Sequence, residues 1–286
     1  MTAASTHVFY VEAVAFWAPT LPGWPIARAA FRGEGDPVDP PAKRPAPEVL
    51  AAAERRRAPD TVALALEVAA AAVAAAGLQA SELPSIFTSA HGDLGVNDYM
   101  CRTLATQPTQ ISPTRFHNSV HNAAAGYWTI GIGCREASSA LTAFDASFAA
   151  GLLEAATQCE ADHRPVLLVA FDVEATGPLA TVTVSQGLVA GALVLAPDPS
   201  ERTLAAFEWR LAPGPSARTP LRSQPARAIA GNAMADALPF FEAVAFDASA
   251  AEPDAGTAEL LLPLSTQLSL ALRPRPFAAR GDVPRA

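Results

Sequence analysis

Two histidines have a spacing that could support metal binding. His117 and His121 are four residues apart, and on a helix this spacing places both imidazoles on one face. A zinc site needs further ligands, and the H-E-x-x-H pattern also needs a glutamate directly after the first histidine. No glutamate follows His117 and no third ligand is evident. We therefore expect no metal and no other cofactor, and we interpret the pair as structural histidines.

Side chains that could act as nucleophiles are also present. Ser147 and Asp145 could serve a Ser-His or Asp-His hydrolase, but no G-x-S-x-G elbow accompanies Ser147. The cysteines form neither a C-x-x-C metal pattern nor a disulfide framework, so we interpret them as buried or incidental thiols. They are Cys101, Cys134 and Cys159. The other histidines are His7, His91 and His163, so no histidine lies beyond residue 163.

These side chains lie within alternating strands and helices. We predict strands over residues 8–17, 85–90, 138–143, 165–171 and 187–196. The last two are continuous apolar runs, typical of strands covered on both faces, and residues 138–143 are predicted to be a short buried strand. We predict helices from near Thr61 to Gly77, with Asp60 as the cap, and over residues 122–128 and 144–157. This alternation indicates an α/β fold with a largely buried sheet.

The remaining segments are less regular. Residues 33–47 are rich in proline and polar side chains, which predicts an irregular surface excursion. Residues 203–211 are expected to form a strand and residues 213–227 a loop. A helix over residues 232–246 and a final strand pair or long strand over residues 260–272 complete the prediction.

Charge and hydropathy narrow the possible partners and location. A formal net charge of −8 disfavours a nucleic-acid partner, because phosphate binding depends on clustered lysine and arginine. The one dense basic run, Arg55, Arg56 and Arg57, is either a solvated helix end or a docking site for an acidic partner. The first lysine or arginine is Arg28, so the N-terminus lacks the basic region of a signal peptide. Residues 62–77 contain Glu67 and are too short for a membrane span. We expect a cytoplasmic protein with no membrane span.

Two stretches resemble the N-terminal half of β-ketoacyl synthases. They are residues 115–128 (RFHNSVHNAAAGYW) and 140–154 (ALTAFDASFAAGLLE). In that family the second stretch is similar to T-A-C-S, with a nucleophilic cysteine at a helix N-terminus, where the helix lowers the thiol pKa. Thr142 and Ala143 match, but Phe144 stands at the position of the nucleophile. The family also uses two histidines from its C-terminal half, which this chain lacks, so the resemblance implies a subunit without catalysis.

A more specific resemblance is to the β-ketoacyl synthase-like subunits of aryl polyene and xanthomonadin-type pigment clusters. It rests on residues 8–24 (VFYVEAVAFWAPTLPGW) and on SPTRFHNSVHNAAAGYW, and it covers roughly residues 8–196. These subunits resemble chain-length factors, partners of an active ketosynthase. The resemblance implies one thiolase-like domain over residues 1–286, a layered α/β/α fold with a truncated C-terminal half. Residues 1–196 would be the ketosynthase-like half and residues 197–286 the shortened part.

The same resemblance implies partners and site residues. The partners are a catalytic ketosynthase in a heterodimer and an acyl carrier protein, for which the arginine run is a possible dock. The family places side chains just before the NAAAG core across the dimer axis, in the partner's acyl tunnel. The tunnel and interface candidates are Phe116, His117, Val120, His121, Asn122, Gly126, Ala140 and Phe144. Core packing is the alternative for Phe116 and Val120.

Two other functions are compatible with the sequence. The chain could be a self-associating acyl-binding or hydrolytic enzyme that uses Ser147 or a histidine. It could also be a scaffold whose pocket is filled. Co-purification with a ketosynthase would distinguish the chain-length factor from both.

Overall fold

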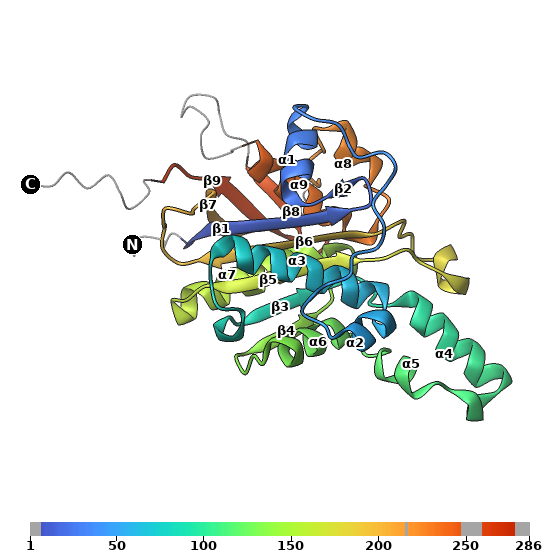
Figure 1. The fold of residues 1–286 in the computed structure, drawn as a ribbon. Coiled ribbons are helices and arrows are strands. Elements are labelled where there is room, and N and C mark those ends of the chain that lie inside the picture. The colour runs from blue at the N-terminus through green and yellow to red at the C-terminus, as the bar shows by residue number, and fades with distance from the viewer. Residues whose placement is uncertain (1–6, 215–216, 247–258, 278–286) are drawn as a thin grey trace, which may run out of the picture.

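A single mixed sheet runs through the computed structural model, which describes residues 7–214, 217–246 and 259–277 (Figure 1). The strand order is β4-β3-β5-β6-β1-β7-β9-β8, and β2 pairs with the end of β1. The strands are β1 His7–Ala18, β2 Leu21–Pro22, β3 Ser85–Thr88, β4 Ser138–Leu141, β5 Val166–Asp172, β6 Val189–Ala196, β7 Ala205–Pro213, β8 Leu260–Pro263 and β9 Leu268–Pro274. The final strand pair is therefore confirmed, and β7 to β9 extend the sheet that the first part of the chain begins.

Three neighbouring strands are parallel and fix the position of the candidate site. β3 pairs in parallel with β4 on one side and with β5 on the other, so that Phe87 lies opposite both Ala140 and Val169. β5 and β6 are buried along their whole length, as their apolar sequences predicted. Because parallel strands end at the same edge of a sheet, the segments that follow β3, β4 and β5 meet there.

Helices cover both faces of this sheet, which gives the predicted α/β/α layers. α3 packs with α6 over one face, and α7, α1 and α9 pack over the other. α4 and α5 project from one end of the molecule (Figure 1). The helices are α1 Trp24–Arg32, α2 Ala52–Arg57, α3 Asp60–Ala76, α4 Leu94–Thr106, α5 Pro113–His117, α6 Ala123–Ile132, α7 Ser147–Asp162, α8 Gln224–Ala228 and α9 Leu238–Ala245. Within the described ranges, no helix combines the length and hydrophobicity needed to span a bilayer.

Several predicted boundaries differ from the structure. Asp60 is the first residue of α3 and does not cap it, because Pro59 is the N-cap residue; the Asp60 carboxylate forms an ion pair with Arg44 instead. Gly77 ends α3 in the left-handed conformation, as predicted. Residues 213–227 are not entirely loop, because Ser223 accepts a hydrogen bond from the Ala226 amide and starts α8. Residues 232–246 divide into a 3-10 segment, Ala233–Ala237, and α9.

Candidate functional site

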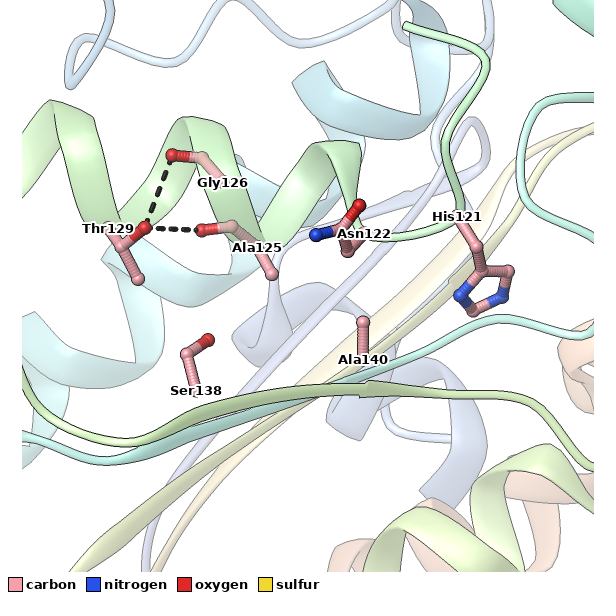
Figure 2. A pocket seen from close by; sticks show the side chains of 7 residues that line it. All are labelled: His121, Asn122, Ala125, Gly126, Thr129, Ser138 and Ala140. Atoms are coloured by element: carbon pink, nitrogen blue, oxygen red, sulfur yellow. Dashed lines mark hydrogen bonds between the residues drawn. The ribbon is translucent and has the colours of Figure 1, made fainter.

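A cavity of about 460 Å³, here the β4 cavity, lies between α6 and β4 (Figure 2). Ser138 and Ala140 rise from the strand toward the helix, and Gly126 leaves the helix surface open because it has no side chain (Figure 2). The Thr129 hydroxyl donates to the carbonyls of Ala125 and Gly126 at 3.0 and 3.2 Å. The cavity is lined by His121, Asn122, Ala125, Gly126, Thr129, Ser138 and Ala140.

The strand below this cavity is an edge strand, and the prediction of a buried strand is wrong. β4 is the last strand in the order of the sheet, and none of its four residues is buried. The Ser85 amide donates to the Ala137 carbonyl at 3.0 Å, and the Ser89 amide donates to the Leu141 carbonyl at 3.4 Å. Because backbone direction alternates along a strand, Ser138 and Ala140 direct their backbone groups away from β3. This edge can pair with another chain.

A second cavity of about 470 Å³, here the Phe116 cavity, adjoins the first and shares Asn122 and Gly126 with it. The exposed fractions of Phe116, Val120 and Ile130 are 63%, 53% and 81%. The alternative that Phe116 and Val120 pack in the core of this chain is therefore wrong, because both residues are largely exposed. The cavity is lined by Leu50, Glu54, Phe116, His117, Val120, Asn122, Ala123, Gly126, Tyr127, Ile130 and Gly131.

The two spaced histidines do not share a helix face. α5 ends at His117, and His121 lies in the turn before α6, so the four-residue spacing does not place the two imidazoles on one helix face. The His117 ring contacts Tyr127 edge-on at 6.0 Å, whereas Nε2 of His121 lies 3.0 Å from the Ser89 carbonyl. Among the described residues, no group of three or more His, Cys, Asp or Glu side chains could hold a metal.

Phe144 occupies a strained turn directly after β4. It begins a short 3-10 segment, Phe144–Ala146, with φ at 53°, a value that bulky residues rarely adopt. The Ser147 hydroxyl donates to the Phe144 carbonyl at 2.8 Å and accepts from the Ala143 amide at 3.0 Å. The predicted helix over residues 144–157 therefore starts at Ser147. The turn presents residue 144 outward, and Phe144 is 54% exposed.

Among the described residues, the side chains next to Phe144 offer no available nucleophile. Its ring packs edge-on against His91 at 5.3 Å. Burial lowers the pKa of His91, and the negative charge of Asp145 partly opposes this shift. Ser147 is completely buried, and both its hydrogen bonds hold the turn. This position argues against hydrolysis through Ser147.

A buried carboxyl group lies at the N-terminus of α7, and sequence reasoning missed it. Oδ2 of Asp236 accepts a hydrogen bond from the Phe148 amide at 2.9 Å, and its buried Oδ1 has no partner among the described residues. Burial raises the pKa of Asp236 to about 7, although the Phe148 amide partly opposes the rise. Asp172, at the end of β5, also has its pKa raised by burial, to about 6. The N-terminus of α7, whose positive dipole would activate a nucleophile, therefore lies next to the carboxyl group of Asp236.

Asp236 makes the stability of the chain depend on pH. The pKa of Asp236 in the folded chain is about 7 against an ordinary value of 3.8, so the folded state holds this proton more tightly. Its contribution is therefore full below about pH 4 and is lost as pH rises through about 7. Asp236→Asn cannot ionise, so the melting temperature of the variant relative to wild type should rise between pH 5 and pH 8. We expect a relative change on the order of 5 °C in thermal unfolding.

The pH dependence is the relevant measurement, because the amide introduced by Asp236→Asn could cost stability at every pH. Asp172 is present in both proteins, but its negative charge contributes to the raised pKa of Asp236, so replacing Asp236 also changes the titration of Asp172. The exposed Asp162, changed to asparagine, is the matched control for removing one carboxylate. Equal pH profiles for wild type and Asp236→Asn would contradict the assignment.

Comparisons with known proteins identify the family. A sequence model described as the β-ketoacyl synthase N-terminal domain matches residues 32–252. No curated protein sequence matches the chain. A chain of the ketosynthase (ApeO) in complex with its chain length factor (ApeC) from Xenorhabdus doucetiae is 22% identical with a TM-score of 0.66. The match covers 95% of this chain and 100% of that one.

Two further solved structures have the same fold. One shows a type II polyketide synthase acyl-carrier protein in complex with its ketosynthase (AntDE:AntF); it is 10% identical, with a TM-score of 0.67 over 94% of this chain and 99% of that chain. The ishigamide ketosynthase/chain length factor is 18% identical, with a TM-score of 0.56 over 71% of this chain and 67% of that chain. This chain therefore belongs to the β-ketoacyl synthase N-terminal domain family and adopts the thiolase-like ketosynthase fold.

Proposed function

We propose that this chain is a non-catalytic, chain-length-factor-like subunit that pairs with an active ketosynthase during elongation of an aryl polyene or related polyketide-type acyl chain. The observation that carries the proposal is Phe144 in the turn between β4 and α7. In the family this turn presents the nucleophilic cysteine at a helix N-terminus. A phenyl ring cannot be acylated, so this turn carries no nucleophile at residue 144.

The other thiols do not replace the missing nucleophile. Cys159 lies inside α7, and burial raises its pKa to about 12. Cys101 is exposed in α4, and Cys134 follows α6. Neither lies at a helix N-terminus, where a thiolate would be stabilised. Decarboxylative condensation also needs donors for the enolate oxygen, and the chain has no histidine beyond His163 to supply them.

The association proposal rests on the unpaired edge of β4 and the apolar side chains around it. Phe116, Val120 and Ile130 are largely exposed in this chain although they are apolar. Exposed apolar patches of this kind mark interaction sites. One similar solved structure is a ketosynthase in complex with its chain length factor. We infer that β4 and α6 form the interface, which for an obligate pair buries on the order of 2,000 Å² or more.

Co-expression with a ketosynthase from the same organism tests this proposal. A tagged copy of this chain should co-purify with the untagged ketosynthase in a stable complex of equal stoichiometry, measured by size exclusion with light scattering. Co-expression with an unrelated ketosynthase is the specificity control. A chain that stays monomeric, or pairs only with itself, in the presence of every encoded ketosynthase would contradict the proposal.

The isolated chain should form no acyl-enzyme. We expect intact-mass spectrometry to show no stable thioester after incubation with an acylated carrier protein, and no condensation with malonyl carrier protein. The co-purified ketosynthase is the positive control in the same assay. A stable thioester on Cys101, Cys134 or Cys159 would contradict the non-catalytic assignment.

Restoring the thiol alone should not restore condensation. Phe144→Cys places a thiol in the turn but leaves the chain without C-terminal histidines and with Asp236 at the N-terminus of α7.

The Asp236 carboxylate at the N-terminus of α7 opposes formation of a thiolate at residue 144. At pH 8 the new thiol should therefore react with iodoacetamide more slowly in F144C than in F144C/D236N. Equal rates would show that Asp236 does not influence this position.

A further inference from the structure

Tyr127 of α6 contacts the segment that carries Phe116 in two ways. Its hydroxyl donates a hydrogen bond to Oδ1 of Asn118 at 3.1 Å, and its ring meets the His117 ring edge-on at 6.0 Å. Tyr127 also lines the Phe116 cavity, together with Phe116 and His117. Tyr127 is therefore both a part of the cavity wall and an anchor for the residues that precede α6.

The anchored segment, residues 113–120, lies almost entirely at the surface. Seven of these eight residues are exposed, and Asn118 is the buried one, with an exposed fraction of 4%. The helix within the segment, α5, has five residues, and so short a helix is not stable by itself. The position of the segment therefore depends on its contacts with the rest of the chain.

Other residues hold the two ends of the segment. Before it, the Tyr99 hydroxyl accepts a hydrogen bond from the Ser112 amide at 3.1 Å. After it, Nε2 of His121 lies 3.0 Å from a backbone carbonyl just beyond β3. Across residues 116–120, Tyr127 provides the only side-chain hydrogen bond and the only ring contact that come from elsewhere in the described chain. The middle of the segment thus has a single side-chain anchor.

Asn118 transmits this anchor to the side chains at the cavity. Phe116 lies two residues before Asn118, and Val120 lies two residues after it. The Asn118 amide donates to two carbonyls of α5, both at 3.1 Å, so the residue also closes the helix that carries Phe116. Loss of the Tyr127 hydroxyl would leave Oδ1 of Asn118 without its donor, which favours other positions of the turn.

We propose that Tyr127 is a positioning residue for length selectivity, because its hydroxyl, through Asn118, fixes the turn that holds Phe116 at the cavity. This inference rests on the proposed function, since only an elongation subunit has products whose length can be selected. A fixed ring leaves space for one chain length, whereas a ring that moves leaves space for several. Tyr127 therefore acts through Phe116 and not by contact with the reacting atoms.

Tyr127→Phe in the reconstituted ketosynthase complex tests this role, because the variant loses the hydroxyl and keeps the ring in the cavity wall. Mass spectrometry of the carrier-bound products should show a wider range of lengths. The fraction outside the main wild-type length should rise about fivefold, the factor that one hydrogen bond typically contributes. Tyr10→Phe is the control, since it removes the hydroxyl of a half-buried tyrosine in β1, and it should keep the wild-type distribution.

Asn118→Ala removes the other end of the same hydrogen bond. It should widen the distribution as Tyr127→Phe does, and the double variant should widen it no further. A Phe116→Ala background then separates positioning from a general loss of stability, which would lower the amount of product and leave its lengths unchanged. In that background Tyr127→Phe should change the distribution by less than about twofold. A wild-type distribution in Tyr127→Phe, or equal widening with and without the Phe116 ring, would overturn the proposal.

A spectroscopic measurement on the isolated full-length chain separates this inference from the proposed function. Para-fluorophenylalanine introduced at residue 116 should give one fluorine resonance with Tyr127 present and a shifted or second resonance in Tyr127→Phe, while Tyr10→Phe leaves the spectrum unchanged. The same spectrum in all three proteins would reject Tyr127 as the anchor of residue 116.

The two kinds of failure give different results. An intact ketosynthase complex with wild-type product lengths in Tyr127→Phe would retain the subunit assignment and reject the positioning role. A fluorine spectrum that responds to Tyr127→Phe, in a chain that pairs with no ketosynthase, would retain the anchor and reject the subunit assignment together with length selectivity.

Discussion

Replacing Ala140 with arginine should abolish the complex with the ketosynthase and leave the isolated chain folded. Ala140 lies on the edge strand β4 and its side chain lines the β4 cavity, where about 460 Å³ is available for the longer side chain. In the complex the same position would be covered, and an unpaired buried charge costs several kcal/mol. We therefore expect at least a hundredfold loss of affinity, measured by co-purification and by titration of the separated subunits.

The control for Ala140→Arg is the same substitution on another strand. Ala212 of β7 is also half-buried, and β7 lies several strands away from β4. Ala212→Arg should leave association unchanged. Thermal unfolding of each isolated variant shows whether it has folded. A folded Ala140→Arg chain that binds the ketosynthase as wild type does would exclude β4 from the interface.

A backbone variant addresses the same edge without adding charge. The Ser138 amide points away from β3, so Ser138→Pro removes a donor from the outer edge and no backbone donor from the sheet of this chain, although it also removes the hydroxyl that accepts from Ser85 at 3.0 Å. This variant should also weaken the complex, provided that the partner adds a strand to β4. It keeps the interface testable should Ala140→Arg fail to fold.

The interior strands could be predicted because their sequences have one interpretation. Residues 165–171 and 187–196 are continuous apolar runs, and β5 and β6 are buried along their whole length. The apolar opening segment likewise became β1 in the middle of the sheet. A long run of apolar, β-branched residues requires cover on both faces whatever the rest of the chain does.

The exposure of β4 and Phe116 could not be predicted in this way. An apolar side chain signals that something covers it, but not whether the cover belongs to the same chain. The sequence SSALTA therefore predicts a buried strand equally well for a monomer core and for an interface. The same ambiguity left Phe116 and Val120 between core packing and tunnel, and their large exposure excludes core packing in the isolated chain.

Asp236 and the histidine pair show two further limits of the sequence, one long-range and one local. Asp236 accepts a hydrogen bond from the amide of Phe148, which lies 88 residues away in the sequence, and no local pattern links the two. The four-residue spacing of His117 and His121 carries no information for a local reason, since α5 stops at His117 and the spacing rule applies only where a helix continues. Helix ends are the least certain feature of any periodic pattern.

Phe116→Ala should change product length with little effect on stability. Phe116 is 63% exposed, so truncation removes few buried contacts in this chain. A buried phenylalanine replaced by alanine costs roughly 3–5 kcal/mol, which corresponds to a fall of many degrees in melting temperature. Phe148, which is 1% exposed in the core, is the matched control, and Phe148→Ala should show that fall. Phe116→Ala should lower the melting temperature of the isolated chain by no more than about 2 °C.

The product distribution of the reconstituted complex tests the tunnel assignment directly. The Phe116 cavity of about 470 Å³ is bounded on one side by this ring, so removing the ring should lengthen the available space by several carbon atoms. We expect Phe116→Ala to yield longer acyl chains and Phe116→Trp to yield shorter ones, measured by mass spectrometry of the carrier-bound products. Opposite shifts from the two substitutions would distinguish a wall of the tunnel from a general disturbance of the interface. Unaltered product length in both variants, with the complex intact, would reject Phe116 as a wall and leave this chain a scaffolding role alone.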